Sequence, residues 1–398
     1  MSAPPSAALA PPALPVALPD DRPPRRPARV RVLYTRYPHW AGHSGITQFA
    51  RWLDPRWAAA TLHGASDSDA DLPLPPLGAE RLRARLRAAV QRGGMEWYKL
   101  SDLAAELRAL PGAVAGRVDV VHFLEGEHSA QYLPAVLRRL GSRGARWSPL
   151  RPARTVATFH QPPELLDRLV DPRVVRLFDH VTVVGPSQLD WFRAHLPAER
   201  VELILHGIDT TYWTPGEAPG SPGSPGRPAG ALRCVTVGHW MRDWAGVRAV
   251  AERLADERGI EFHVVTAQPT AVDDLPNVVR HRGVADDVLR RLYQDADVLF
   301  LPLVESTANN ALLEGIACGL PVVSTALESV RAYVPGGEAI LVEGSDPARL
   351  ADALLALRAD PARRRTMGAQ ARARAESLAW PLVAPAYARM YARLAEGA

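Results

Sequence analysis

Short apolar runs alternate with stretches of helical periodicity along most of the chain. Each run is bounded by turn residues, which is the pattern of strands buried on both faces of a parallel sheet. In the first half this predicts strands over 30–35, 118–123, 154–159, 180–185 and 201–205, and helices over 45–53, 79–92, 99–110, 129–140, 164–169 and 187–195. In the second half it predicts strands over 232–237, 261–266, 277–282, 297–301, 320–324 and 339–342, and helices over 245–257, 285–293, 308–317 and 346–358, followed by a helical C-terminus.

These alternating elements predict an α/β fold with two doubly wound, Rossmann-like domains. Segment 211–230 has the Pro/Gly/Ser composition of a linker, so we expect an N-terminal domain at 29–210 and a C-terminal domain at 231–380. Residues 1–28 are rich in proline and predict a disordered tail. We expect a helix over 381–396 to pack back on the N-terminal domain. Sheets of this kind bind ligands at the carboxyl ends of their strands, which places the site in the cleft between the domains.

The composition is that of a globular protein with a mildly basic balance. The chain has 398 residues, of which 47% are hydrophobic and 23% are charged, and its formal net charge is +4. Basic and acidic residues are interspersed, so we expect no nucleic-acid partner. Lys99 is the only lysine. Contacts with a phosphate must therefore come mainly from arginine or from the backbone.

Two features bear on the compartment. No apolar run has the length of a membrane-spanning helix, and the N-terminus lacks the basic start and apolar core of a secretory signal. Cys234 and Cys318 lie in apolar surroundings without a CxxC or a metal-ligand spacing, which predicts two buried free thiols. We expect a cytoplasmic protein.

The stretch 305–325, ESTANNALLEGIACGLPVVST, predicts a loop, a helix and a strand in quick succession. We expect Thr307 as the N-cap and Ala308, Asn309 and Asn310 at the opening of the helix, where free N–H groups can hold a phosphate. Glu314 lies on the same helical face as Asn310. Its carboxylate can accept hydrogen bonds from two ribose hydroxyls, and the alternative is a solvated helical glutamate.

Several segments, in order, resemble the retaining GT-B glycosyltransferases of family 4 (group 1). The resemblance spans about residues 30 to 395 and rests on the segments DADVLFLPLVESTANNALLEGIACGLPVVST, GVADDVLRRLY, VELILHGID, VDVVH and RTVATFH. It implies a GT-B fold, in which the C-terminal domain binds a nucleotide-diphosphate sugar and the N-terminal domain binds the acceptor. It also implies transfer with retention of configuration, without a metal and without another cofactor.

The resemblance carries roles onto the glutamates. Glu314 matches the second glutamate of the family's E-x7-E motif, which binds the nucleotide ribose. The first glutamate of that motif contacts the donor sugar, but its position here is Ser306, and Glu305 lies one residue earlier. A bulge in the loop would let Glu305 reach the sugar, and the alternative is that Ser306 has replaced it.

A second departure from the family concerns the phosphates. In the family, the glycine that follows the first strand of the C-terminal domain is followed directly by Arg and, some five residues on, by Lys. In this chain that glycine is Gly238, and the sequence from it reads GHWMRD. Arg242 is the best candidate for the diphosphate, because arginine is always charged and can bind bidentately. His239 would be a second, weaker donor. The alternative for Arg242 is an ion pair with Asp243 or a plain surface position.

The N-terminal domain contributes further candidates through the same resemblance. His160 would hydrogen-bond a sugar hydroxyl or stabilise developing charge, which groups it with Glu305 and Arg242 as catalytic candidates. His122 could line the same cleft. Gly45 matches the glycine loop after the first strand, where the backbone can approach the donor or acceptor, and the alternative is a plain turn.

The stretch 81–92, RLRARLRAAVQR, predicts a basic helix with apolar residues at helical spacing. We favour a solvated helix whose apolar seam packs on the core. The alternative is peripheral contact with an anionic membrane at its inner face.

We therefore predict a metal-independent retaining glycosyltransferase that moves a sugar from a nucleotide-diphosphate sugar to an acceptor, either a glycan, a lipid or a small molecule. One alternative is a nucleotide-sugar-binding protein that has the fold without turnover. Another is a GT-B nucleotide-sugar epimerase. The sequence does not indicate the sugar, the base, the acceptor or the oligomeric state.

Overall fold

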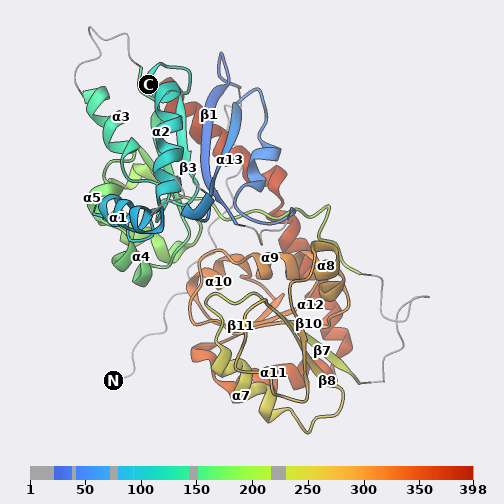
Figure 1. Cartoon of the computed structure of the whole chain (residues 1–398). Helices are drawn as coiled ribbons and strands as arrows, with labels where there is room; N and C mark the ends of the chain where they lie inside the picture. Colours follow the sequence, from blue (N-terminus) through green and yellow to red (C-terminus); the bar gives the residue numbers. More distant parts are fainter. Residues whose placement is uncertain are drawn as a thin grey trace, which may run out of the picture.

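A computed structural model describes residues 22–37, 42–71, 79–92, 94–142, 151–216 and 230–397. Two α/β domains lie one above the other in Figure 1, each with a parallel sheet covered by helices. This confirms the predicted fold class. Residues 1–21 of the predicted tail and 217–229 of the predicted linker lie outside the described residues.

The N-terminal sheet is formed by apolar runs that are buried on both faces. Its strands are β1 (Ala28–Arg36), β2 (Ala58–Ser66), β3 (Val120–Phe123), β4 (Arg154–Phe159), β5 (His180–Val183) and β6 (Val201–Leu203). They are all parallel in the order β2-β1-β3-β4-β5-β6. Along β3, Val121 and Phe123 face one core cluster and Val120 faces the other, as the period of a strand requires.

The helices of this domain follow most of the predicted helical stretches. They are α1 (Ala79–Gln91), α2 (Leu100–Val114), α3 (Leu133–Ser142), α4 (Pro163–Leu169), α5 (Pro172–Val175) and α6 (Leu189–Arg193), with 3-10 turns η1 (Gln48–Trp52), η2 (Asp69–Asp71), η3 (Pro186–Gln188) and η4 (Ala198–Arg200).

The predicted elements differ from the structure in two longer segments of this domain. The helix expected over 45–53 is only the 3-10 turn η1, because Gly45 has a φ of 99° and cannot belong to a right-handed helix. Strand β2 was not predicted, since its sequence AAATLHGAS has few β-branched residues. It forms because it pairs with β1 over its whole length, from Ala28 opposite Ala58 to Arg36 opposite Ser66.

The C-terminal sheet is built on the same plan. Its strands are β7 (Leu232–Val237), β8 (Ile260–Val265), β9 (Val278–His281), β10 (Val298–Leu301), β11 (Val322–Thr325) and β12 (Ala339–Val342), in the order β12-β11-β10-β7-β8-β9. Val298 and Phe300 of β10 face one cluster, and Leu299 and Leu301 face the other. Both faces are therefore buried, as expected for a parallel sheet.

The helices of this half are α7 (Trp244–Arg253), α8 (Asp286–Gln294), α9 (Asn310–Ala317), α10 (Glu328–Tyr333), α11 (Pro347–Ala359), α12 (Pro361–Ser377) and α13 (Trp380–Glu396), with the 3-10 turn η5 (Glu343–Ser345). The short α10 was not predicted. The helical C-terminus is two helices, because α12 ends at Ser377 and α13 begins at Trp380 with a proline in its first turn.

Helix α13 crosses to the N-terminal domain, where it lies beside β1 in Figure 1. Trp380, Tyr387 and Met390 belong to the same buried cluster as Val30 and Val32 of β1. The crossing is fixed by a parallel bridge between Ile208 and Ala379. The end of the chain is therefore part of the N-terminal core.

His122 also belongs to this core and does not line a cleft, contrary to the alternative raised for it. It has no exposed surface. Its Nδ1 lies 2.6 Å from the hydroxyl of Tyr391, and its Nε2 lies 2.7 Å from Oγ1 of Thr158. Burial lowers the pKa of His122 to about 3, so the ring is neutral.

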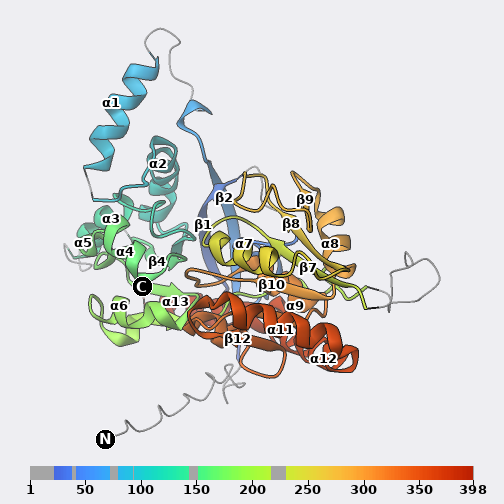
Figure 2. The same cartoon turned by 90° about the horizontal axis from the view of Figure 1, so that it is seen from below.

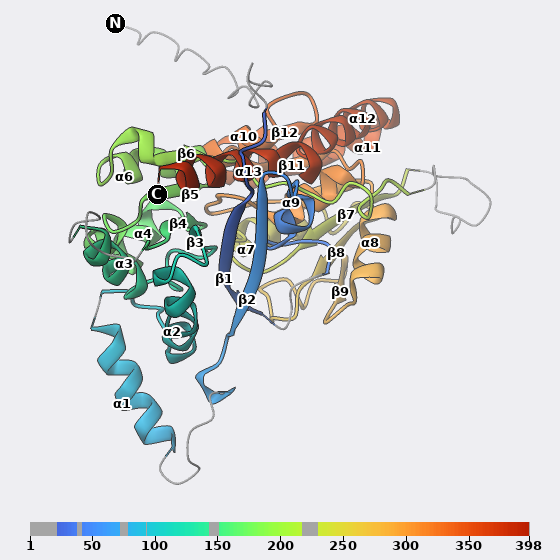
Figure 3. The ribbon, with the colours of Figure 1, turned by 90° about the horizontal axis from the view of Figure 1, so that it is seen from above.

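The basic helix α1 lies at the periphery of the N-terminal domain in Figures 2 and 3. Leu82 and Leu86 are 43% and 39% exposed, and only Val90 packs against the core. The prediction that the apolar seam packs on the core is therefore wrong for most of the helix. Contact with an anionic membrane stays a prediction. No helix among the described residues is long and apolar enough to cross a membrane.

The tail expected over 1–28 includes residues with defined contacts. Arg26 pairs with Asp119 at 2.7 Å, and Ala28 is the first residue of β1.

We predict that Trp380→Ala lowers the free energy of unfolding by about 3–5 kcal/mol, because it leaves a large cavity where α13 meets the N-terminal core. Chemical denaturation measures this difference. Leu382→Ala is the matched control on the same helix: Leu382 is 61% exposed, and its truncation should cost less than about 0.5 kcal/mol. Equal effects of the two substitutions would contradict the docking of α13.

Candidate functional site

The two domains meet where the strands of both sheets end at their carboxyl edges. The loop after β1 contacts the C-terminal domain through Ser44, whose hydroxyl donates to Glu314 on α9. The loop before α9 contacts the N-terminal domain through Thr307, whose hydroxyl donates to the carbonyl of His160 after β4. Residues from distant parts of the sequence therefore converge on the N-terminal end of α9.

Asn309, not Thr307, caps this helix. The side chain of Asn309 accepts a hydrogen bond from the backbone of Leu312 at 3.2 Å, and the helix begins at Asn310. The predicted N-cap was wrong because Thr307 uses its hydroxyl across the domain boundary instead. Ala308 is partly buried against the core of the C-terminal domain. With Thr307 bonded across the boundary, the start of α9 lies at the junction of the domains.

Glu314 is buried in the second turn of α9, with 4% of its surface exposed. Its carboxylate accepts hydrogen bonds from Ser44 Oγ at 2.5 Å and from the hydroxyl of Tyr293 at 2.8 Å. Burial raises the pKa of Glu314 to about 7, although both hydrogen bonds favour the charged form. The alternative of a solvated helical glutamate is therefore wrong.

The loop that carries Ser44 is fixed by a turn and by an indole. Gly45 has a φ of 99°, a conformation that favours glycine. Trp213, which is fully buried, donates from Nε1 to Ser44 Oγ at 3.1 Å. Sequence analysis found Gly45 but missed Ser44, Trp213 and Tyr293. For Tyr293 the signal was its place at the end of GVADDVLRRLY, but nothing local pairs it with Glu314.

Arg242 lies between the loop after β7 and the start of α9. Its Nη2 and Nε donate to the carbonyl of Val237 at 2.6 and 2.8 Å, and Nη2 lies 3.4 Å from Oδ1 of Asn309. Asp243 instead caps α7 by accepting from Gly246, so the alternative of an Arg242–Asp243 ion pair is wrong. Burial lowers the pKa of Arg242 to about 10, which leaves it charged at neutral pH.

The conformation of this loop depends on Gly238. Its φ is 87°, and a Cβ there would come within 2.7 Å of Nη2 of Arg242. His239 is exposed and lies beside Trp244, with ring centroids 5.9 Å apart. Trp240 is exposed, and its ring centroid lies 6.4 Å from that of Trp97 in the N-terminal domain.

Glu305 and Ser306 have different environments. Ser306 is buried, and its backbone N–H donates to Oε1 of Glu305 at 2.8 Å. Glu305 is half-buried, and burial raises its pKa, with the nearby Glu164 and Glu328 acting in the same direction. The carboxylate of Glu305 thus folds back on its own loop. Which of the two residues contacts a sugar stays a prediction.

His160 is held by a buried acid that sequence analysis missed. The backbone N–H of His160 donates to Oε1 of Glu127 at 3.2 Å, and its Nδ1 lies 3.8 Å from the same oxygen. Burial lowers the pKa of His160 to about 3 and raises that of Glu127 to about 7. A neutral His160 ring can hydrogen-bond a hydroxyl but carries no positive charge.

Across the described ranges, no three His, Cys, Asp or Glu side chains are grouped to hold a metal ion. Cys234 and Cys318 are buried free thiols, as predicted.

Comparison with known proteins finds a family match within the C-terminal domain. A family model described as "Glycosyl transferases group 1" matches residues 233–360. Residues 233–360 are therefore similar to a group 1 glycosyl transferase domain. This match includes β7, the Arg242 loop and α9, which together hold most of the predicted donor site.

Curated relatives and solved structures extend the comparison beyond the group 1 domain. An alignment of 217 positions with a D-inositol 3-phosphate glycosyltransferase of Arthrobacter sp. (strain FB24) shows 31% identity and covers 47% of this chain and 52% of the relative. The chain thus spans about half the length of that relative. It is 28% identical over 352 residues to the protein of the same name from Geodermatophilus obscurus, covering 77% of this chain and 75% of the relative.

The solved structures agree on the fold. A sucrose-phosphate synthase from Thermosynechococcus elongatus superposes with a TM-score of 0.68 at 17% identity, covering 93% of this chain and 100% of that one. Anabaena Alr3699/HepE, in complex with UDP and glucose, superposes with a TM-score of 0.55 at 14% identity, covering 90% and 98%. The GT-B fold and the resemblance to group 1 glycosyltransferases are therefore confirmed.

We predict that Tyr293→Phe raises the pKa of Glu314 further above its ordinary range, because it removes one of two hydrogen bonds that favour the carboxylate. Carbon-13 NMR of labelled glutamate follows this titration directly. Tyr333→Phe is the matched control, since the Tyr333 hydroxyl donates to Val184 and not to Glu314. A pKa of Glu314 that is unchanged in Tyr293→Phe would contradict the described geometry.

Proposed function

We propose that this protein is a retaining glycosyltransferase that moves a sugar from a nucleotide-diphosphate sugar to an acceptor without a metal ion. The observation that carries the proposal is the buried carboxylate of Glu314, which lies in a group 1 domain at the junction of the two domains. A buried carboxylate needs hydrogen-bond donors, and a pair of ribose hydroxyls supplies two. In this proposal the ribose hydroxyls replace those of Ser44 and Tyr293.

The diphosphate would lie between the loop after β7 and the N-terminal end of α9. Arg242 supplies a charge that neutral carbonyls do not cancel, and within the described residues no carboxylate forms an ion pair with it. The first turn of α9, near Asn309 and Asn310, adds free N–H groups and the positive end of the helix dipole. Gly238 and the exposed His239 complete this side.

Transfer of the sugar would take place between the two domains, beside the loop after β4. His160 is neutral and is oriented by Glu127, so its ring would accept a hydrogen bond from a sugar hydroxyl or donate one to it. Glu305 or Ser306 would contact the same sugar from the loop before α9. Arg242 and α9 would stabilise the charge on the leaving diphosphate, so that the acceptor attacks from the side the leaving group vacates. Contacts between the domains that the donor does not displace, such as Thr307 with the carbonyl of His160, would exclude water and favour transfer over hydrolysis.

The substrates to assay first come from the comparisons. Anabaena Alr3699/HepE was solved with UDP and glucose, which makes UDP-sugars the first donors. The relatives are named for D-inositol 3-phosphate, which makes that compound the first acceptor.

A donor panel tests the function. The protein is incubated with UDP-, GDP- and ADP-sugars, with and without acceptor, and the products are separated. We expect transfer or slow hydrolysis with one donor class, retention of the anomeric configuration, and no loss of activity in EDTA. Binding without turnover on any donor would instead support the binding protein, and an isomerised sugar without acceptor would support the epimerase. Loss of activity in EDTA that metal restores would contradict metal independence.

We predict that the affinity for UDP-glucose falls as the pH is lowered through about 7, the raised pKa of Glu314. Ribose hydroxyls donate to the ionised carboxylate, so below this pKa binding must displace a proton, at a cost of about tenfold per pH unit. Calorimetry at pH 5.5 to 8.5 measures the profile.

Two variants complete this pH experiment. Glu314→Gln should weaken binding by about tenfold at pH 8 and remove the pH dependence. Glu252→Gln, an exposed change on α7 of the same domain, should alter neither. A Glu314→Gln profile identical to that of the wild type would show that Glu314 does not contact the ribose.

A further inference from the structure

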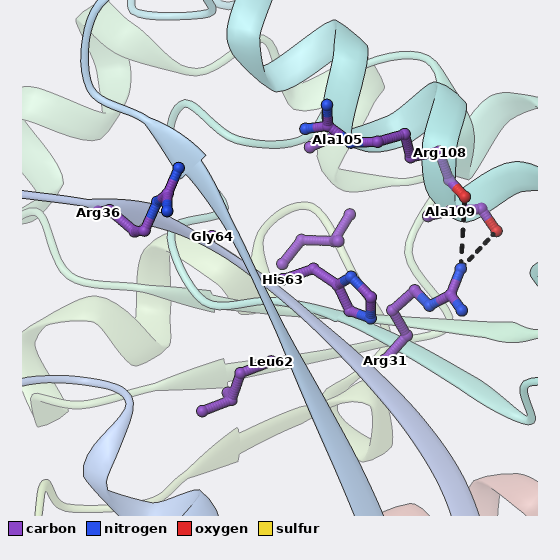
Figure 4. A pocket seen from close by; sticks show the side chains of 9 residues that line it. Arg31, Arg36, Leu62, His63, Gly64, Ala105, Arg108 and Ala109 are labelled. Carbon is purple, nitrogen blue, oxygen red and sulfur yellow. Dashed lines mark hydrogen bonds between the residues drawn. The ribbon is translucent and has the colours of Figure 1, made fainter.

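A pocket lies at the outer edge of the N-terminal sheet, between strands β1 and β2 and helix α2 (Figure 4). Its volume is about 350 Å³, which lies within the range of small-molecule sites. None of its lining residues belongs to the site at α9. They are Arg31, Leu33, Arg36, Leu62, His63, Gly64, Ala105, Arg108 and Ala109.

Every charged group that lines this pocket is basic. Three arginines, Arg31, Arg36 and Arg108, contribute to it together with His63, and no Asp or Glu does. Within the described residues these three arginines form no ion pair, whereas Arg29, two positions before Arg31 on the same strand, pairs with Asp119 at 2.9 Å. Among the described residues, no carboxylate therefore neutralises the positive charge of the pocket.

Arg31 has donors that its protein partners leave unused. Its Nη1 makes two long hydrogen bonds of 3.4 Å, to the carbonyls of Arg108 and Ala109 on α2, which Figure 4 shows as dashed lines. Its Nε is buried and has no partner among the described residues. A buried N–H without an acceptor is costly, and carbonyl oxygens do not cancel a charge. The guanidinium of Arg31 is therefore held in place but lacks an anion.

The electrostatic surroundings of His63 agree with a positive charge in the pocket. Burial lowers its pKa, and the positive charges of Arg31 and Arg108 lower it further. The part of this lowering that comes from the two arginines reflects a positive local potential, which an anion in the pocket would relieve.

We propose that the pocket between β1, β2 and α2 binds the phosphate group of a phosphorylated molecule. Guanidinium groups match a phosphate through bidentate, charge-assisted hydrogen bonds, and arginines around one cavity suit its double charge. The apolar side chains of Leu33, Leu62 and Ala105 line the same volume and would contact a carbon skeleton. The phosphate belongs either to a free metabolite or to a lipid headgroup. This site is independent of the donor site at Glu314.

Calorimetry with inorganic phosphate tests the proposal on the full chain. Binding to the wild type should weaken about tenfold or more in Arg31→Gln and in Arg108→Gln, because each variant loses charge-assisted hydrogen bonds. Arg253→Gln, an exposed change on α7, removes the same charge and should bind like the wild type. Arg108 is itself exposed, so Arg108→Gln should keep the fold, and thermal unfolding checks this for each variant.

A second arm distinguishes the two sources of phosphate. Flotation is measured with phosphatidylcholine vesicles that contain or lack phosphatidic acid. Flotation that needs phosphatidic acid, Arg31 and Arg108 assigns the pocket to a lipid headgroup. Calorimetric binding without such flotation assigns it to a free phosphorylated metabolite. If neither probe binds in a way that depends on Arg31 and Arg108, the proposal is wrong, whatever the outcome of the sugar-transfer assay.

Discussion

The site depends on one buried carboxylate that takes its partners from two domains. Glu314 on α9 is hydrogen-bonded by Ser44 of the N-terminal domain and by Tyr293 of its own domain. Removing a carboxylate from water is costly, so its position is stable only while donors surround it. The buried indole of Trp213 holds Ser44 in place. The geometry of the candidate donor site and the contact between the domains are therefore the same set of interactions.

The chain crosses between the domains twice, and the second crossing fixes the first. After β6 the backbone passes through Ile208 into the C-terminal domain, and it returns through Ala379 into α13, where these two residues form a bridge. Arg372 of α12 strengthens this region by donating to the carbonyls of Thr210, Trp213 and Ala317. Because both crossings lie side by side, movement between the domains would be concentrated at one place.

In this chain with a single lysine, arginine side chains both bind backbone carbonyls and supply positive charge for anions. Arg242 and Arg372 direct their planar guanidinium groups at several backbone carbonyls at once, which a lysine ammonium matches less well. Such bonds fix the side chain without neutralising it, although Nε of Arg372 also forms an ion pair with Glu376 at 2.8 Å. A guanidinium held by carbonyls keeps its charge for an anion, and this holds both beside α9 and in the pocket around Arg31.

The sequence by itself determined the two sheets, the group 1 resemblance and the place of Glu314 on a helix. Strands such as β3 and β10 were predictable because both their faces are buried, which leaves a continuous apolar run in the chain. Local chemistry was less reliable where a side chain bonds across the domains, as with Thr307, whose expected role as N-cap falls to Asn309. The edge strand β2 was missed because pairing with β1, and not its own composition, makes it a strand.

Only the tertiary structure decided which residues meet. Ser44 lies 270 positions from Glu314 in the chain, and Arg31 lies 77 positions from Arg108. Periodicity reports which face of an element is buried, but it carries no information about which distant loop arrives there. The burial of Glu314 and the unneutralised charge around Arg31 are both consequences of such long-range packing.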